Sequence, residues 1–138
     1  MIQLLLHLWG DFIVQTDTQA QGKKLKGSYG SWCCFKHCLT YSLPFLFIGS
    51  WQAVLVIFST HYLIDRTKLI DYLIAFKNGT KGVMIIKEGE TPRFETNHYD
   101  ISNFGFSKDR PQVLTLWLYI ITDNIFHITI NFLALTYL

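Results

Sequence analysis

Charged residues are absent from long stretches of the chain. Residues 39–64 contain no Asp, Glu, Lys or Arg, and residues 111–138 contain a single charged residue, Asp123. Runs of this length without charge are typical of membrane-embedded segments. The first run is interrupted at Gly49-Ser50, which predicts two helices over 32–49 and 51–75 joined by a tight turn. We therefore expect a helical hairpin in the first half of the protein.

Two further apolar segments complete the predicted architecture. Residues 111–138 predict one long helix with Pro111 near its first turn. Residues 2–16 carry only Asp11 as a charged group, and they lack the basic start and the cleavage site of a signal peptide. We expect this segment to remain in the mature protein as a short first helix. The predicted fold class is all-α: an integral membrane bundle of about four helices, forming a single membrane-embedded domain over 1–138.

Polar segments separate these helices. Residues 17–31 are rich in Gln, Lys, Gly and Ser, and residues 76–110 contain Gly-bearing turns and a short β-like run at 83–86. The longer segment is too polar for a bilayer, so we expect a hairpin or an irregular excursion between the third and fourth helices. Alternating helix directions place both segments on one side of the membrane. Their Lys and Arg residues predict that this side is cytoplasmic.

Composition supports a membrane location and excludes other classes of protein. Half of the 138 residues are hydrophobic and only 16% are charged, against roughly 25% in an ordinary soluble domain. The formal net charge is +2, too small for a protein that tracks nucleic-acid phosphates, so the expected partner is membrane lipid and not nucleic acid. The three cysteines lie close together and provide no disulfide framework.

Histidines and aspartates recur in pairs inside the predicted helices. Four of the five histidines lie on these helices, and three of the four have an aspartate four residues away. The pairs are His7 with Asp11, His61 with Asp65, and Asp123 with His127. A four-residue step places both members of a pair on one helical face. Composition gives each histidine roughly a one-in-ten chance of such a partner, so three pairs exceed what composition explains.

These pairs, together with His37, predict a metal site. Ionisable side chains inside a membrane face a partner or a water-filled cavity, and three adjacent carboxylates repel one another unless a cation neutralises them. Mixed His and Asp ligands suit Zn²⁺, Mn²⁺ or Fe²⁺, with zinc expected first, and their number could hold two ions. The predicted metal ligands are His7, Asp11, His37, His61, Asp65, Asp123 and His127.

A hydrogen-bonded His–Asp network is the alternative to a metal. Any single pair could hold neighbouring helices together, as polar side chains do in membranes. Gln15 and Asn131 lie one helical turn beyond two of the pairs, where they could orient ligands, contact substrate or bond between helices. Arg66 follows Asp65 directly and could hold an anionic group. The clustered cysteines do not complete a zinc knuckle, which needs a second ligand pair.

The ordered motifs resemble one protein family. They are His7-Leu-Trp-Gly-Asp11 with Gln15, His61-Tyr-Leu-Ile-Asp65-Arg66, and Asp123-Asn-Ile-Phe-His127. This set resembles the bacterial and phage membrane proteins grouped as domain of unknown function thirty-three-oh-seven. The resemblance covers most of the chain outside 76–105. It implies a protein integral to a bacterial inner membrane, encoded by the bacterium or by a phage.

The His/Asp arrangement is also similar, more distantly, to small inner-membrane proteins described as metal-dependent hydrolases. That likeness implies hydrolysis of phosphoester or lipid-linked substrates, with Asp65, Asp123 and Arg66 as catalytic residues. A carboxylate would serve as general base or bridging ligand, and Arg66 would stabilise charge on the substrate. The other interpretation is a non-enzymatic membrane protein: an ion or proton conduit, or a partner-binding subunit with a structural metal or a His–Asp network.

Overall fold

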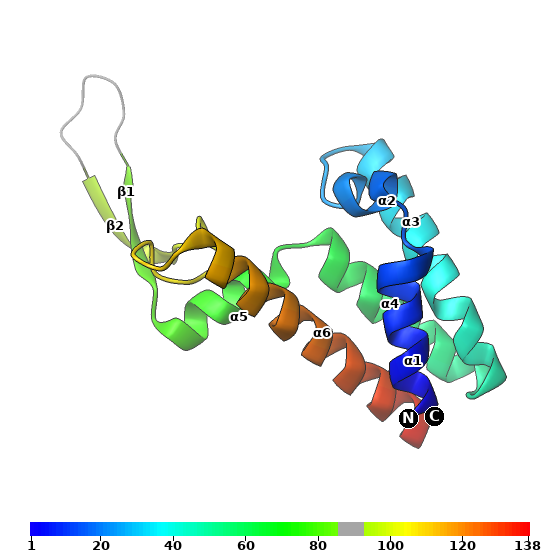
Figure 1. The fold of residues 1–138 in the computed structure, drawn as a ribbon. Coiled ribbons are helices and arrows are strands. Elements are labelled where there is room, and N and C mark those ends of the chain that lie inside the picture. The colour runs from blue at the N-terminus through cyan, green and yellow to red at the C-terminus, as the bar shows by residue number, and fades with distance from the viewer. Residues whose placement is uncertain (86–92) are drawn as a thin grey trace. The chain divides into compact units, whose positions relative to one another are not determined.

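The fold is predominantly helical and includes an antiparallel pair of strands (Figure 1). The computed structural model describes residues 1–85 and 93–138. In chain order its elements are α1 (Ile2–Leu8), the π-helix η1 (Trp9–Val14), α2 (Asp17–Gly22), α3 (Ser28–Ser42), the 3₁₀-helix η2 (Leu43–Phe47), α4 (Trp51–Arg66), α5 (Leu69–Asn78), β1 (Lys81–Ile85), β2 (Arg93–Tyr99) and α6 (Gln112–Tyr137). The predicted helical character is confirmed.

The chain divides into two compact units. Unit 1 comprises Met1–Thr67 and Asn124–Leu138, and unit 2 comprises Lys68–Asp123. The boundary therefore falls inside α6. A single membrane-embedded domain over the whole chain stays a prediction.

The N-terminal apolar segment is a helix whose geometry changes midway. α1 continues into η1, so helix ends at residue 14 where the pattern predicts 16. Single π-helical turns are rare and are frequently found at functional sites, and Asp11 lies in this one. A Cβ atom on Gly10 would overlap the ring of the buried Tyr41. The missing side chain at Gly10 therefore lets η1 approach α3 closely.

The expected helical hairpin is present in unit 1 with shifted boundaries. α3 begins at residue 28 where the pattern predicts 32, and η2 extends it to residue 47. The predicted break at Gly49-Ser50 is confirmed, because the Ser50 hydroxyl caps α4 by accepting a hydrogen bond from the Ala53 amide at 3.1 Å. α3 and α4 then pack against each other.

The single helix predicted over 51–75 is wrong, because α4 ends at Arg66 and α5 begins at Leu69. Thr67 between them has an extended backbone with φ −113° and ψ 177°. Its hydroxyl donates to the Leu63 carbonyl at 2.7 Å, which satisfies one acceptor at the end of α4. A β-branched residue has a low helix propensity, and no Gly or Pro marks this break in the sequence.

A short helix, α2, lies in the segment 17–31 that the pattern describes only as polar. The Thr16 hydroxyl accepts a hydrogen bond from the Gln19 amide at 3.3 Å, and the Gln19 side chain accepts one from the Thr16 amide at 2.9 Å. This capping box satisfies two backbone donors that the first helical turn leaves free. The Thr-x-x-Gln spacing is the sequence signal for α2.

Unit 2 contains α5, the strand pair and the first part of α6. β1 and β2 run antiparallel, from Lys81 opposite Tyr99 to Ile85 opposite Arg93. This is the hairpin that the pattern predicts as one alternative for 76–110; residue 86 of the β-like run lies outside the described residues. Gly79 ends α5 in the left-handed conformation with φ 64°, which glycine adopts at little cost.

Unit 1 has a small apolar core at the end opposite to α2. Its members are Tyr41, Phe45, Ala53, Ile57 and Ala134, contributed by α3, η2, α4 and α6. They are buried almost completely. Along these helices, the core therefore lies between the predicted His and Asp ligands and the turn at residue 49.

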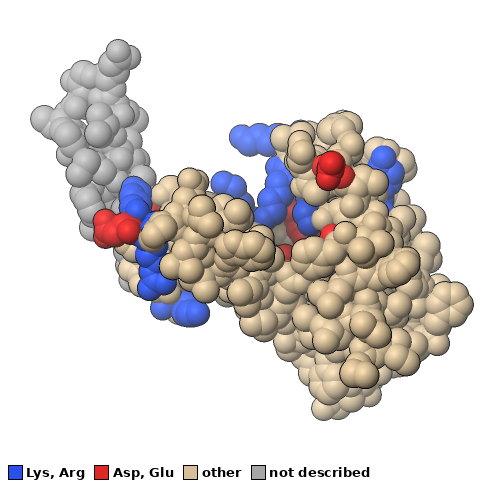
Figure 2. Space-filling view, viewed as in Figure 1, with Lys and Arg blue, Asp and Glu red and all other residues tan. Residues whose placement is uncertain are grey.

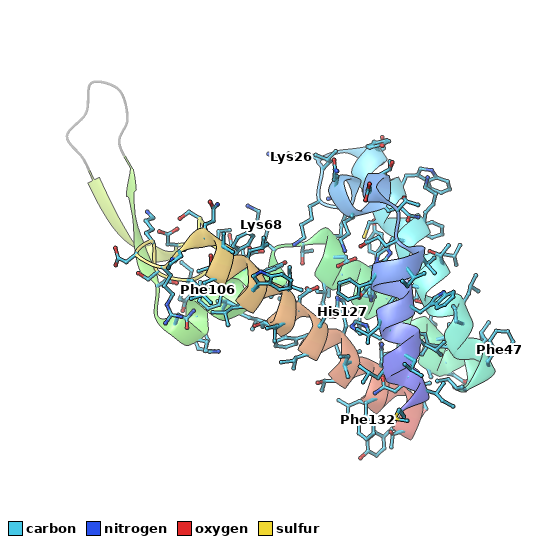
Figure 3. The ribbon with its side chains drawn as sticks, viewed as in Figure 1. Lys26, Phe47, Lys68, Phe106, His127 and Phe132 are labelled. Carbon is cyan, nitrogen blue, oxygen red and sulfur yellow. The ribbon has the colours of Figure 1, made fainter. Side chains whose placement is uncertain are left out.

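The surface of unit 1 is unusually apolar. Phe47 is 91% exposed, Trp51 67% and Phe132 54%, and Figure 3 shows Phe47 and Phe132 pointing outward. All eight charged residues of this unit lie within 11–36 or at 65–66. Figure 2 shows the charged side chains gathered at the α2 end of this face and an uncharged remainder. Exposed apolar area of this extent indicates contact with lipid or with another apolar surface.

Among the described residues, one helix is long and apolar enough to cross a membrane. It is α6, which has 26 residues, about 39 Å at 1.5 Å per residue. The helical stretch 2–14 is also apolar but shorter. This supports membrane association weakly by itself, and the four-helix membrane bundle stays a prediction.

Candidate metal centre

Ligand-type side chains from three elements of unit 1 converge in its interior. Asp11 comes from η1, His37 from α3, and His61 and Asp65 from one face of α4. The side chains of His37, His61 and Asp65 are at most 3% exposed, whereas Asp11 is 16% exposed. We call these four residues the tetrad. Asp11 is the member that solvent reaches most easily.

Ligand atoms of the tetrad are separated by similar distances. His37 Nε2 lies 3.0 Å from His61 Nε2, 3.2 Å from Asp11 Oδ1 and 3.3 Å from Asp65 Oδ2. His61 Nε2 lies 3.6 Å from Asp11 Oδ1 and 3.4 Å from Asp65 Oδ2. A tetrahedral zinc ion with bonds of about 2.0–2.1 Å holds its ligand atoms about 3.3 Å apart. These five distances are close to that value. The ligand atoms of Asp11, His37 and His61 all lie within 4.8 Å of one another, in a group that does not include Asp65.

Hydrogen bonding leaves parts of the tetrad unsatisfied. Among the residues that the structure describes, buried Asp11 Oδ1 accepts no aligned hydrogen bond, and buried His61 Nδ1 has no hydrogen-bond partner. Buried polar atoms without partners destabilise a fold. A cation at the centre of the tetrad would satisfy Asp11 Oδ1. His61 differs from most metal-bound histidines, because these donate their second ring N–H to a protein group.

His7 lies beside the tetrad and has partners on both ring nitrogens. Its Nε2 donates to Asn124 Oδ1 at 2.8 Å, and its Nδ1 contacts the Tyr41 hydroxyl at 2.6 Å. Asn131 Nδ2 donates to the same hydroxyl at 2.7 Å. His7 Nδ1 is also 3.5 Å from Asp11 Oδ2. This geometry suits His7 and Asn131 to positioning Asp11 and Tyr41 rather than to binding a metal directly.

His127 packs against the tetrad from α6. Its ring stacks on His61 with centroids 4.0 Å apart and an interplanar angle of 26°, and its Nε2 lies 3.8 Å from Asp65 Oδ1. Figure 3 shows His127 on the inner side of α6. Asp123 precedes His127 by one helical turn and belongs to unit 2. The seven predicted ligands thus separate into an inner four, two neighbouring histidines and Asp123.

Lys23 contacts the tetrad, although the sequence pattern does not single it out for a site. Its Nζ lies 2.8 Å from Asp65 Oδ2, the oxygen that also faces both tetrad histidines. With its amide oriented to suit its neighbours, Gln15 accepts from Lys23 Nζ at 3.2 Å and donates to the Asp11 carbonyl at 3.3 Å. A lysine stem can cross apolar surface to deliver its charge. Only the fold of α2 brings Lys23 to this place.

Tyr41 and Cys38 are the other side chains that sequence reasoning did not place at the site. Tyr41 lies four residues after His37, so helical spacing alone indicates that they share a face. Cys38 Sγ forms a second possible ligand group with His61 and Asp65, all within 4.8 Å of one another. A buried thiol commonly packs as a small apolar group.

Arg66 makes its hydrogen bonds away from the tetrad. Its Nε donates to Ser31 Oγ at 3.3 Å, and its guanidinium also donates to the Gly27 carbonyl at 3.4 Å. Both acceptors lie at the start of α3. Arg66 thus links α4 to the N-terminal end of α3. Although Arg66 follows Asp65 directly in sequence, the two side chains lie on different faces of α4.

Comparison with known proteins gives one match. No curated protein and no solved structure matches the chain. The family described as Protein of unknown function (DUF3307) matches residues 1–138. This match confirms the resemblance carried by the His/Asp motifs and extends it through the segment 76–105. The chain belongs to the DUF3307 family.

Proposed function

We propose that this protein is a membrane-bound, metal-dependent hydrolase that acts on phosphoester or lipid-linked substrates. The observation that carries the proposal is the tetrad: two imidazole nitrogens and two carboxylate oxygens from three helical elements, with five separations of 3.0–3.6 Å that are close to those around a tetrahedral divalent ion. Zinc fits this donor set best, and manganese or iron are alternatives.

The apolar surface of unit 1 supports an integral membrane location. Its charged residues are confined to the α2 end, while large apolar side chains are exposed along α1, α3, α4 and α6. By the positive-inside rule, the lysines at 23, 24 and 26 favour a cytoplasmic α2 end. A bacterial inner membrane is the proposed site, and the exposed side of Asp11 would then face the cytoplasmic interface.

Cysteine labelling in intact membranes tests this topology. Ser28→Cys, at the α2 end, should react with an impermeant thiol reagent only from the cytoplasmic side. Gln52→Cys, in the first turn of α4, should react only from the opposite side. Both positions are exposed, and the three natural cysteines are buried, so the wild type serves as a low-background control. Labelling of both variants from one side would contradict the topology.

The tetrad could support hydrolysis through a small number of residues. A bound divalent ion would supply Lewis-acid stabilisation of a phosphoryl or acyl oxygen and make hydroxide available near neutral pH. Asp11, the more exposed carboxylate, is suited to accept a proton from an attacking water at Oδ2, the oxygen that faces His7 and not the tetrad histidines. Asp65 is held between Lys23 and the histidines, which suits a fixed ligand. Asp123 and Arg66 are the further catalytic residues of the proposal.

Turnover by metallated protein tests the hydrolase. Detergent micelles of phosphatidic acid and phosphatidylglycerol sample phosphomonoester, phosphodiester and acyl-ester bonds when they are assayed for released phosphate, glycerol, glycerol phosphate and free fatty acid. Asp65→Asn and Asp123→Asn should abolish turnover, and Arg66→Ala should raise KM with metal content unchanged. Absence of turnover with fully metallated wild type, or wild-type rates in the Asn variants, would leave a structural metal as the better assignment.

A non-enzymatic network is the second candidate, and the Lys23–Asp65 ion pair favours it. This ammonium already places a positive charge against the buried carboxylate, so the histidines and aspartates could form a polar network without a metal. An ion or proton conduit is less suitable. Beyond Tyr41, the described core residues Phe45, Ala53, Ile57 and Ala134 carry no polar side-chain group that could continue a path towards the far end.

A further inference from the structure

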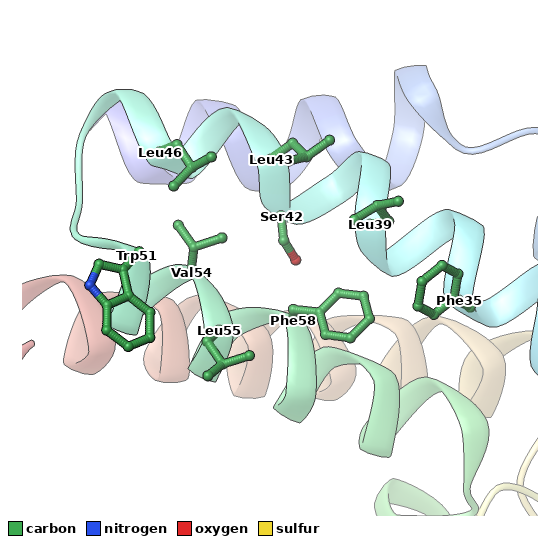
Figure 4. Close-up of a pocket in the computed structure, with 9 residues that line it drawn as sticks. All are labelled: Phe35, Leu39, Ser42, Leu43, Leu46, Trp51, Val54, Leu55 and Phe58. Atoms are coloured by element: carbon green, nitrogen blue, oxygen red, sulfur yellow. The ribbon is translucent and has the colours of Figure 1, made fainter.

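A groove between α3 and α4 lies on the outer face of unit 1. It holds about 450 Å³ and is lined by uncharged side chains, with the Ser42 hydroxyl pointing into the space between the helices (Figure 4). Phe35, Leu39 and Ser42 of α3 and Leu46 of η2 form one wall at helical spacing. His37 lies on another face of the same helix. The groove is therefore separate from the tetrad.

One end of the groove adjoins a pocket with hydroxyl groups. This pocket holds about 620 Å³ and is lined by Ser28, Ser31, Trp32, Phe35 and Tyr62. Phe35 lines both spaces, so they are neighbours along α3.

Two cations contact residues that line the hydroxyl-bearing pocket. Arg66 donates to Ser31 Oγ at 3.3 Å, and the Lys36 ammonium lies 5.7 Å from the centroid of the Trp32 ring. An apolar groove thus lies next to a pocket with hydroxyl groups and basic side chains.

We propose that this groove binds one anionic phospholipid, with an acyl chain along the apolar part and the phosphate beside Ser31, Arg66 and Lys36. A guanidinium matches phosphate oxygens geometrically, and the hydroxyls can donate further hydrogen bonds. The inference rests on the membrane location in the proposed function and needs neither the metal nor the hydrolysis.

The dimensions of the groove agree with a lipid in one leaflet. Along α3 and η2, the distance from Phe35 to Leu46 is about 18 Å at the rise of these helices. One leaflet of a bilayer core is about 15 Å thick. The basic end of the groove is also the end of unit 1 that carries its lysines. An acyl chain in the groove therefore places its headgroup where the cytoplasmic interface is proposed.

A second apolar groove provides a contrast within the same unit. It holds about 400 Å³ between α4 and α6 and is lined by Val56, Ile130, Leu133, Ala134, Tyr137 and Leu138. None of these described residues is charged, so the second groove can accept an acyl chain without selecting a headgroup. Selectivity for an anionic lipid is the property that distinguishes the α3–α4 groove.

Lipid retention by the full chain tests the inference. Protein purified in mild detergent is exchanged into micelles with phosphatidylglycerol or phosphatidylcholine, and bound lipid is counted by native mass spectrometry. Ser42→Phe fills the groove and should lower phosphatidylglycerol retention about tenfold. Ser42→Ala should retain the lipid. It removes a hydroxyl that, among the described residues, has no hydrogen-bond partner, so the fold should tolerate it.

Headgroup selectivity provides the second readout. Arg66→Gln should abolish the preference for phosphatidylglycerol, whereas Lys26→Gln, an exposed charge at the same end of unit 1, should keep it. Equal retention of both lipids by the wild type overturns the inference, as does unchanged retention in both Ser42→Phe and Arg66→Gln. The count of bound lipid depends neither on bound metal nor on turnover. Failure of the hydrolase assay therefore leaves this result interpretable, and failure here leaves the hydrolase proposal standing.

Discussion

His37→Gln should remove the bound metal from the purified protein. His37 Nε2 lies within 3.3 Å of a ligand atom from each of the other three tetrad members, so its loss breaks the centre of the arrangement. Changes to residues around metal ligands weaken metal affinity about 10–100-fold. Loss of a ligand itself should weaken metal affinity by more than about 100-fold, which corresponds to about 2.8 kcal/mol. Because binding free energy contributes to folding, the variant should also melt at a lower temperature than metallated wild type.

His7→Gln is the matched comparison for His37→Gln. Both histidines are fully buried, but both His7 nitrogens already contact Asn124 and Tyr41. His7→Gln should therefore weaken metal binding by a smaller factor and remain loaded at saturating zinc. Metal content and a chelator competition titration measure the difference. Equal losses in the two variants would contradict the division between the tetrad and its neighbours.

Lys23→Met should tighten metal binding. The Lys23 ammonium competes for Asp65 Oδ2, an atom of the tetrad, and repels a divalent ion held beside it. Removing this charge should raise metal affinity at least about tenfold, or 1.4 kcal/mol. Methionine keeps the length and apolar character of the lysine stem, so packing around it should be retained. The measurement is again chelator competition in one detergent.

The same variant separates the two candidate functions. If the tetrad is a metal-free network, Lys23→Met leaves Asp65 buried without a counter-charge, which costs roughly 3–5 kcal/mol. The variant would then melt far below wild type, and added zinc would not restore it. The metal centre predicts instead that zinc restores the stability of Lys23→Met. Lys24→Met, at an exposed neighbouring position, controls for the loss of a positive charge.

The parts of the fold that depend on local sequence could be predicted. The pattern predicts a helix over 111–138, and α6 spans Gln112–Tyr137. The turn at Gly49-Ser50 carries a glycine followed by a capping serine. The break at Thr67 was beyond this reasoning, because its extended backbone is marked by neither Gly nor Pro. α2 was accessible through the Thr16–Gln19 capping box, a signal weaker than hydrophobic periodicity.

The candidate site likewise has a part that local sequence predicts and a part that depends on how the helices pack. Helical spacing predicts that His61 and Asp65 share a face, because this relation exists within one helix. Which histidines meet across helices depends on packing, so the sequence could not separate His37 in the tetrad from His7 beside it. Lys23 reaches Asp65 from a segment 42 residues away in sequence. Its role follows from the fold of α2 and from no local pattern.

The metal content of the detergent-purified wild type tests the central claim most directly. Elemental analysis, with protein concentration measured by amino-acid analysis, should find a single divalent ion per chain, most often zinc. Excess chelator should remove this ion and lower the melting temperature, and added zinc should restore both. A protein free of metal, whose melting temperature excess chelator and added zinc leave unchanged, would contradict the metal centre and favour the hydrogen-bonded network.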